Sequence, residues 1–357
     1  MGMTMKNYAD LPLPEAGSLT KVADGIFWLR MPLPFDLDHI NLYLIEDTDG
    51  IYVIDTGLGT DTTRAHWEAI FSQLGKPVKA VIVTHMHPDH IGLAGWITEK
   101  FRVPFYMTRT EYFASRALFG GANGADNWTD RAYFTAMGMA KEQVERAVSG
   151  NKGLSAVVSP IPLSYRRLSH GLVLPINGEH WEVLIGSGHS PEHACLYCQE
   201  RQILIAGDQV LPAISPNIGA YSTEPDVNSL DDYLKSLSML MQLPASTLVL
   251  PAHNQPFYEL HNRLAALRQH HQQHLDALVE ACREEQTVVS CLPVLFKREL
   301  SGRNIFFAVA ECLSHLNYLR YENYIERRLD ENGVWRFRSI DCEQIDGGEP
   351  DMDFLSV

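Results

Sequence analysis

The stretch Val81-Ile-Val-Thr-His-Met-His-Pro-Asp-His-Ile-Gly92 decides how the rest of the chain is interpreted. It begins within an apolar, β-branched run, Ala80 to Thr84, which is typical of a strand buried on both faces. Pro88 stands where a helical pattern begins, because the missing N–H of proline costs nothing in the first turn of a helix. A strand, a tight loop and a helix start bring the side chains of the loop to one point.

Four side chains of this loop are common metal ligands: His85, His87, Asp89 and His90. Neutral imidazoles and carboxylates suit Zn(II), Fe(II) or Mn(II), and the loop has no cysteine that would favour a soft metal. The alternative is a polar loop in which the histidines have no joint role. Four ligand types at such close spacing favour a metal centre at the end of the strand.

The run His85-Met-His-Pro-Asp-His90 resembles the His-x-His-x-Asp-His motif of the metallo-β-lactamase-fold hydrolase superfamily. The resemblance implies three further ligands in a fixed chain order, and the chain offers a match for each. These are His189 in Gly188-His-Ser-Pro-Glu-His193, Asp208 in Ile205-Ala-Gly-Asp208, and His253 in Leu250-Pro-Ala-His253.

The resemblance implies an α/β fold, the αββα sandwich of the superfamily, and the pattern of the chain agrees with it. Strand-like and helical segments recur in two blocks, and the matched residues follow strands, where α/β proteins place ligands. We expect the catalytic domain to span residues 1–258. Residues 108–158 would form a helical insertion, either a cap over the metal cleft or a surface helical hairpin.

The C-terminal third has a different pattern. Two helical stretches precede a hairpin with an Asn332-Gly333 turn. This order resembles the winged-helix appendage of the superfamily branch that includes β-lactamase-like protein 2, a branch that contains endoribonucleases. We expect a winged-helix-like domain over residues 259–340 and an acidic tail over 341–357. His270 and His274 lie four apart on a helix, where a solvated face is favoured over a metal pair.

Composition limits the partners. The net charge of −15 repels nucleic-acid phosphates, and residues 261–340 carry eleven Lys or Arg against ten Asp or Glu. Nucleic acid is therefore the less favoured partner, and the appendage is expected to serve packing or formation of a homodimer. No apolar stretch is long enough to span a membrane, and no signal-peptide core is visible, so the cytoplasm is expected. Six cysteines give no disulfide framework, and Cys195 and Cys198 are expected to be packing residues on a strand.

By the resemblance, His85, His87 and His189 would hold one divalent ion, and Asp89, His90 and His253 a second, with Asp208 bridging both. Zinc is expected, with iron or manganese as alternatives. Two such ions lower the pKa of a shared water to about 7, and the resulting bridging hydroxide attacks carbon or phosphorus. Asp89 would also be catalytic, since it would orient that nucleophile and pass its proton to the leaving group.

Four other residues are assigned supporting roles. Asp55, in Ile54-Asp-Thr-Gly57, matches a strand-end aspartate of the superfamily and would support the ligand loop from behind. His193 would stand behind the ligands or near the substrate. Tyr221 and Ser222 are the hydroxyls most able to reach a cleft, although ordinary loop packing is the more common role.

The expected function is that of a dinuclear metal-dependent hydrolase acting on a small thioester or carboxylic ester. A metal-dependent phosphodiesterase or endoribonuclease is the alternative, since the same site serves both reactions. An alternative of another class is a non-catalytic binding protein that retains the fold. The intact ligand set counts against that last hypothesis.

Overall fold

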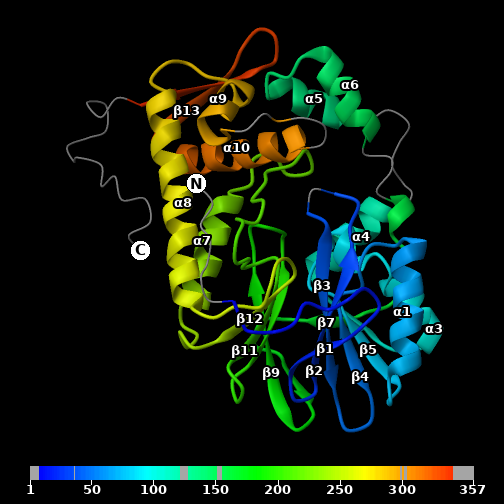
Figure 1. Ribbon diagram of the computed structural model, residues 1–357. Helices are drawn as coiled ribbons and strands as arrows, with labels where there is room; N and C mark the ends of the chain where they lie inside the picture. Colours follow the sequence, from blue (N-terminus) through cyan, green and yellow to red (C-terminus); the bar gives the residue numbers. More distant parts are fainter. Residues whose placement is uncertain are drawn as a thin grey trace. The chain divides into compact units, whose positions relative to one another are not determined.

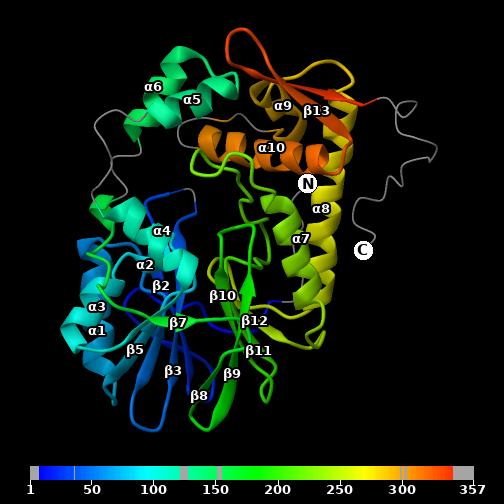
Figure 2. The ribbon, with the colours of Figure 1, turned by 180° about the vertical axis from the view of Figure 1, so that it is seen from behind.

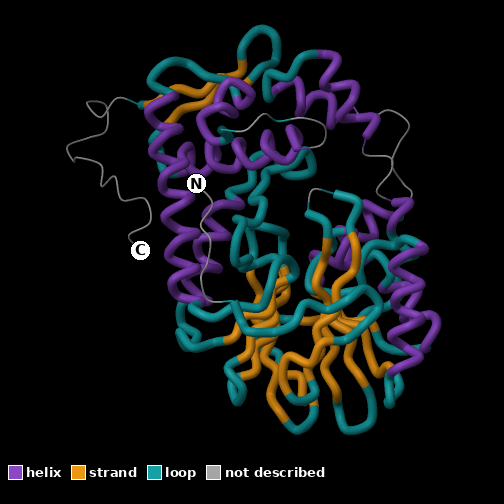
Figure 3. The backbone as a smooth tube through the Cα atoms, viewed as in Figure 1, coloured by secondary structure: helices purple, strands orange, loops and turns teal. Residues whose placement is uncertain are grey.

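Figure 1 shows the computed structural model, which describes residues 8–35, 37–120, 128–150, 155–297, 300 and 304–340. The chain forms two compact units that alternate along the sequence. The first comprises Met1–Asn123, Gly153–Pro216 and Met239–Leu264, and the second comprises Gly124–Lys152, Asn217–Ser238 and Ala265–Val357. The first unit is built on two β-sheets, whereas the second is mainly helical (Figure 3).

The larger sheet of the first unit has seven strands in sequence order. They are β1 (Thr20–Ala23), β2 (Ile26–Pro32), β3 (His39–Glu46), β4 (Ile51–Ile54), β5 (Val78–Ile82), β6 (Phe105–Thr108) and β7 (Arg166–Leu168). The strands β1 to β4 pair antiparallel, and β4 to β7 pair parallel. The tight turn between β3 and β4 is closed by the N–H of Asp47, which donates to the carbonyl of Gly50 at 2.7 Å.

The smaller sheet has five strands. Its order is β12 (Leu248–Pro251), β11 (Ile203–Gly207), β10 (His193–Cys198), β9 (Glu179–Gly186) and β8 (Val173–Ile176). The pair β11 and β12 is parallel, and the other pairs are antiparallel. The parallel pair matters for the site because its two carboxyl ends lie at the same edge of the sheet.

An apolar core lies between the two sheets, which face each other in Figures 1 and 2. Trp28 and Ile82 enter it from the larger sheet, and Trp181 and Leu196 from the smaller one. Cys195 and Cys198 of β10 are buried free thiols, and Cys198 belongs to this core. The predicted α/β sandwich is therefore confirmed.

Helices cover the outer face of the larger sheet. The helices α1 (Asp61–Gln73) and α3 (Ala94–Phe101) contribute Trp67 and Ile97 to a second apolar core, which includes Val81 of β5. Between β5 and α3 lies the short helix α2 (Pro88–Ile91), which has proline in its first turn as predicted. The helix α4 (Arg109–Phe119) follows β6. This packing fixes the loop that follows β5.

The second unit is assembled from helices and one hairpin. The helices are α5 (Trp128–Ala136), α6 (Lys141–Gly150), α7 (Ser229–Leu240), α8 (Leu260–Ala281), α9 (Val288–Leu295) and α10 (Asn304–Tyr321), of which α7 and α8 begin or end in the first unit. The expected terminal hairpin is β13 (Ile325–Leu329) with β14 (Trp335–Ser339), paired antiparallel. Its likeness to a winged helix stays a prediction.

Several expectations about these segments have different outcomes. The segment 108–158 divides between the units, because α4 lies in the first and α5 and α6 in the second, so its role as a cap stays a prediction. The predicted acidic tail, residues 341–357, lies outside the described chain.

The prediction that His270 and His274 lie on a solvated helix face is wrong. Both residues are half-buried, and the ring of His274 lies 5.4 Å from the ring of His315 on α10. Within the described residues, no helix has the length and apolarity to cross a membrane.

Candidate metal centre

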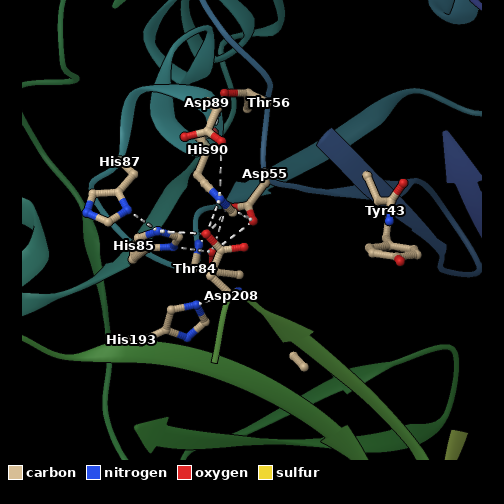
Figure 4. Close-up of polar contacts among 12 residues, drawn as sticks. Tyr43, Asp55, Thr56, Thr84, His85, His87, Asp89, His90, His193 and Asp208 are labelled. Carbon is tan, nitrogen blue, oxygen red and sulfur yellow. Dashed lines mark hydrogen bonds and ion pairs between the residues drawn. The ribbon is translucent and has the colours of Figure 1, made fainter. Parts of the chain in front are cut away.

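Strand ends bring the predicted ligands together. The loop after β5 carries His85, His87, Asp89 and His90, while the loops after β9, β11 and β12 carry His189, Asp208 and His253. The two sheets are joined at this edge, since the N–H of Ala194 in β10 donates to the carbonyl of Thr84 at 2.9 Å. Figure 4 shows how the loop after β5 and Asp208 face one another.

Within the described residues, the cluster divides into two groups whose ligand atoms all lie within 4.8 Å of one another. The first group is His85, His87, His189 and Asp208, and the second is Asp89, His90 and His253. All seven residues expected to bind metal therefore lie in one group or the other. The two groups have the members that the sequence resemblance implied, with Asp208 counted in the first, and their occupation by two ions stays a prediction.

The carboxylate of Asp208 lies between the two groups. Its Oδ2 is 3.3 Å from Nε2 of His189 in the first group and 3.5 Å from Nε2 of His90 in the second. Its Oδ1 is 3.4 Å from Nε2 of His253. One carboxylate thus faces imidazoles of both groups, which is the arrangement that a bridging ligand needs.

The two groups differ in their electrostatics. Burial and neighbouring imidazoles lower the pKa of His85 and of His87 well below the usual value, so both rings are neutral and offer lone pairs. Burial also lowers the pKa of His90, but the carboxylates of Asp55, Asp208 and Asp89 outweigh it and raise that pKa well above the usual value. The carboxylates around His90 therefore favour a positive charge at this position, which a bound cation would supply in place of the proton.

The donor set fits divalent cations. Nε2 of His90 and Oδ1 of Asp208 are buried and lack a hydrogen-bond partner among the described residues. Leaving buried polar atoms unpartnered costs free energy, and a metal ion between them would satisfy both atoms. Imidazole nitrogens and carboxylate oxygens without a thiolate suit zinc, iron or manganese.

Further side chains orient the rings. The carboxylate of Asp55 accepts hydrogen bonds from the N–H and the hydroxyl of Thr84, both at 2.8 Å, and lies 2.8 Å from Nδ1 of His90. The Nδ1 of His253 lies 2.8 Å from the carbonyl of His39. Carboxylate and carbonyl partners of this kind fix the tautomer and direction of metal-binding imidazoles. The supporting role of Asp55 stays a prediction that this geometry favours.

His193 lies behind the cluster. Its Nε2 accepts a hydrogen bond from the backbone N–H of Asp208 at 3.1 Å, and the ring is outside both groups. The ring packs so closely on Gly207 that an added Cβ there would lie 2.5 Å from it. Of the two interpretations left open for His193, the structure favours the position behind the ligands.

Tyr221 and Ser222 belong to the second unit and lie outside both groups. The hydroxyl of Tyr221 donates to Oδ1 of Asn217 at 2.6 Å, and the hydroxyl of Ser222 donates to the carboxylate of Asp130. Both hydrogen bonds are contacts of loop packing within the second unit. That either hydroxyl group reaches a substrate stays a prediction.

Sequence reasoning missed Glu111. This residue is in the first turn of α4 and is fully buried, and its carboxylate accepts hydrogen bonds from the N–H groups of Met86 and Glu192, both at 2.9 Å. Burial raises the pKa of Glu111, and those N–H donors oppose that rise. An acidic residue in the first turn of a helix is common, so the sequence carries no signal for this role.

Two family models match the chain. One, described as the metallo-beta-lactamase superfamily, matches residues 35–253, and the other, described as the metallo-beta-lactamase-like C-terminal domain, matches residues 275–340. Residues 35–253 include every member of both groups described above. The C-terminal match confirms that the appendage occurs in relatives of this fold.

Similar proteins include solved structures and curated relatives. A beta-lactamase domain protein from Burkholderia ambifaria is 38% identical, with a TM-score of 0.86 over 94% of this chain and 98% of that one. A probable metallo-hydrolase, YqjP, from Bacillus subtilis is 24% identical over 87% of this chain and 97% of its own length. The acyl-coenzyme A thioesterase MBLAC2 from Bos taurus is 27% identical over 66% of this chain and 80% of its own length.

Proposed function

The chain belongs to the metallo-β-lactamase superfamily and is a hydrolase, and we propose that it works with two divalent ions on a small thioester or carboxylic ester. The observation that carries the proposal is the position of Asp208. A carboxylate that faces His189 and His90 through one oxygen and His253 through the other suits a pair of ions rather than one. Zinc is the proposed metal, and iron or manganese would fit the same donors.

The first group, His85, His87, His189 and Asp208, would hold one ion. The second group, Asp89, His90 and His253, would hold the other and share Asp208. When bound, such ions lower the pKa of water to about 7 and stabilise negative charge on the attacked oxygen.

Asp89 is the proposed proton carrier. Its side chain is 20% exposed, whereas those of His85 and His90 are fully buried, so a substrate can approach Asp89 more readily than either of those rings. A carboxylate in that position can orient an attacking water by accepting its hydrogen bond. It can then deliver the proton to the leaving thiol or alcohol.

Two observations favour a thioester or ester over a phosphodiester. The relative from Bos taurus is named as an acyl-coenzyme A thioesterase, and it covers two thirds of this chain. The net charge of −15 opposes long-range attraction of a nucleic-acid backbone. The substrate is therefore proposed to be small and to react at a carbonyl carbon.

The test is hydrolysis by zinc-loaded protein of three probes: a short acyl-coenzyme A, p-nitrophenyl acetate and bis(p-nitrophenyl) phosphate. We expect turnover of the carbonyl substrates, loss of that turnover after chelation, and a decrease in kcat of about 100-fold or more in Asp89→Asn. A preference for the phosphodiester would contradict the substrate class. No turnover of any probe by metal-loaded protein would contradict the proposed substrate class as well.

A further inference from the structure

We propose that Glu111 is a positioning residue that joins the two loops of the first group and thereby sets the metal affinity of that group selectively. The inference rests on the proposed metal centre. It concerns neither a ligand nor a group that touches substrate. It assigns a function to a buried carboxylate on α4 that lies between two segments far apart in sequence.

The two oxygens of Glu111 serve different loops. Oε2 accepts from the N–H of Met86, which stands between His85 and His87. Oε1 accepts from the N–H of Glu192, three residues after His189 in the loop that follows β9. A single side chain thus connects the two loops that supply all three imidazoles of the first group.

The first turn of α4 is fastened to the loop after β9 by other contacts as well. The hydroxyl of Thr108 donates to the carbonyl of Glu192 at 2.8 Å, and the N–H of Thr110 donates to Oε2 of Glu192 at 2.7 Å. These bonds hold α4 against one loop. The bond from Oε2 of Glu111 to Met86 extends the connection to the other loop.

The connection matters because metal coordination tolerates little displacement. Nε2 of His85 and Nδ1 of His87 lie 2.9 Å apart, and the ring centres of His87 and His189 are 4.7 Å apart. Distances between a metal and its ligands must hold within about 0.2 Å. A loop that shifts by a fraction of an ångström therefore lowers affinity at this group.

The second group depends on a different carboxylate. Asp55 lies 2.8 Å from Nδ1 of His90, while the described hydrogen bonds from backbone N–H groups to Glu111 come from the loops of the first group. Asp55 also accepts from Thr84, whose hydroxyl lies 3.1 Å from Nδ1 of His85, so Asp55 supports both groups. Both backbone donors of Glu111 lie next to or near ligands of the first group, so changing Glu111 is expected to weaken that group more than the second.

The experiment is a titration of metal-free protein with Co(II) and Zn(II), in which affinity is measured by competition with a chromogenic chelator and geometry by the Co(II) visible spectrum. The test variant is Glu111→Gln, which keeps one carbonyl oxygen but presents an amide donor to the other N–H. Glu192→Gln is the matched control, because that carboxylate serves α4 alone and is partly exposed. Asp55→Asn is the comparison variant, because Asp55 supports rings of both groups.

In Glu111→Gln we expect one of two equivalents to bind about 10- to 100-fold more weakly with an altered Co(II) spectrum, while the other equivalent stays at wild-type affinity. Asp55→Asn should weaken both equivalents, because Asp55 contacts His90 directly and His85 through the hydroxyl of Thr84. Glu192→Gln should keep both affinities within about threefold. Glu111→Asp, whose shorter side chain is not expected to connect both loops, should weaken the same equivalent as Glu111→Gln.

Unchanged affinities, or equal weakening of both equivalents, in Glu111→Gln would overturn the proposal. So would loss of folding of the metal-free protein in both Glu111 variants, measured by thermal unfolding, because the residue would then be structural. Wild-type protein that binds no metal would overturn the proposed function together with this inference. If wild-type protein binds two ions and Glu111→Gln binds them with unchanged affinity, this inference alone would be overturned.

Discussion

The molecule contains two histidine clusters, which differ in the residues that surround their imidazole rings. In the first unit, imidazoles at strand ends lie among the carboxylates of Asp55, Asp89 and Asp208. In the second unit, His270, His271 and His274 of α8 lie with His315 of α10, ring against ring. Ring centres are as close as 4.2 Å in the second cluster and 3.9 Å in the first.

The contacts of the second cluster are those of a packed core. Nδ1 of His271 lies 3.0 Å from Nε2 of His315, and Nδ1 of His315 lies 2.8 Å from the carbonyl of Glu311. Burial, with neighbouring His315, His270 and Lys297, lowers the pKa of His274 to about 3, and burial lowers that of His315 to about 4. Both rings are therefore neutral at pH 7, and none of the four histidines belongs to a described metal group.

The comparison teaches that clustered imidazoles do not by themselves make a metal centre. What distinguishes the first unit is convergence of nitrogen atoms on shared carboxylates, above all Asp208, which supply the negative charge that a divalent ion balances. Two substitutions can separate the clusters experimentally.

The largest difference is expected between two variants of metal-loaded protein, each of which lacks one ring of one cluster. His253→Ala removes a ligand of the second group, so we expect kcat on the best carbonyl probe to fall by about 10³-fold, or about 4 kcal/mol in activation free energy. His274→Ala should keep kcat within about threefold, because its ring packs in the other unit. Steady-state kinetics on both variants checks this. A similar loss of kcat in His274→Ala would contradict the distinction between the clusters.

A smaller effect concerns the buried carboxylate beside the second cluster. Burial raises the pKa of Glu311 to about 7, opposed by a hydrogen bond from Asn217, whereas His253 and His90 hold the pKa of Asp208 well below its usual value despite burial. Between pH 4.5 and 7 the folded chain keeps the Glu311 proton that the unfolded chain has lost, so stability falls as pH rises. The loss of stability caused by the ionisation of Glu311 is absent below pH 4.5 and reaches its full size above pH 7.

Glu311→Gln retains the acceptor for Asn217 without the charge. At pH 8 we expect this variant to unfold with a free energy about 3 kcal/mol higher than wild type, and at pH 4.5 to differ little. Urea denaturation of metal-free protein at both pH values measures the difference, with exposed Glu326→Gln as the control. If the free energy of unfolding differs between Glu311→Gln and wild type by the same amount at both pH values, the carboxyl group of Glu311 is not buried in its protonated form.

The sequence was sufficient for features set by local spacing. The strand before His85, the proline that starts α2 and the hairpin of β13 and β14 follow from patterns within a few residues of one another. The remaining predicted ligands followed from resemblance, which supplies chain order where local pattern cannot. Their convergence in two groups was then found in the structure.

Features that depend on distant packing could not be predicted. Glu111 acts on backbone groups 25 and 81 residues away, and its own sequence context is that of an ordinary helix start. The position of His193 was left open because it depends on how closely β10 approaches Gly207. His274 lies against His315 of α10, and His270 lies against His271 and His274, so helical spacing alone could not predict that both would be half-buried.

The most direct test of the account is the metal content of protein purified without chelator, measured by elemental analysis for wild type and Asp208→Ala. We predict about two equivalents of zinc, iron or manganese per wild-type chain. Most of that metal should be lost in the variant, because Asp208 faces both groups. Wild-type protein without metal, or an Asp208→Ala variant that keeps both equivalents, would contradict it.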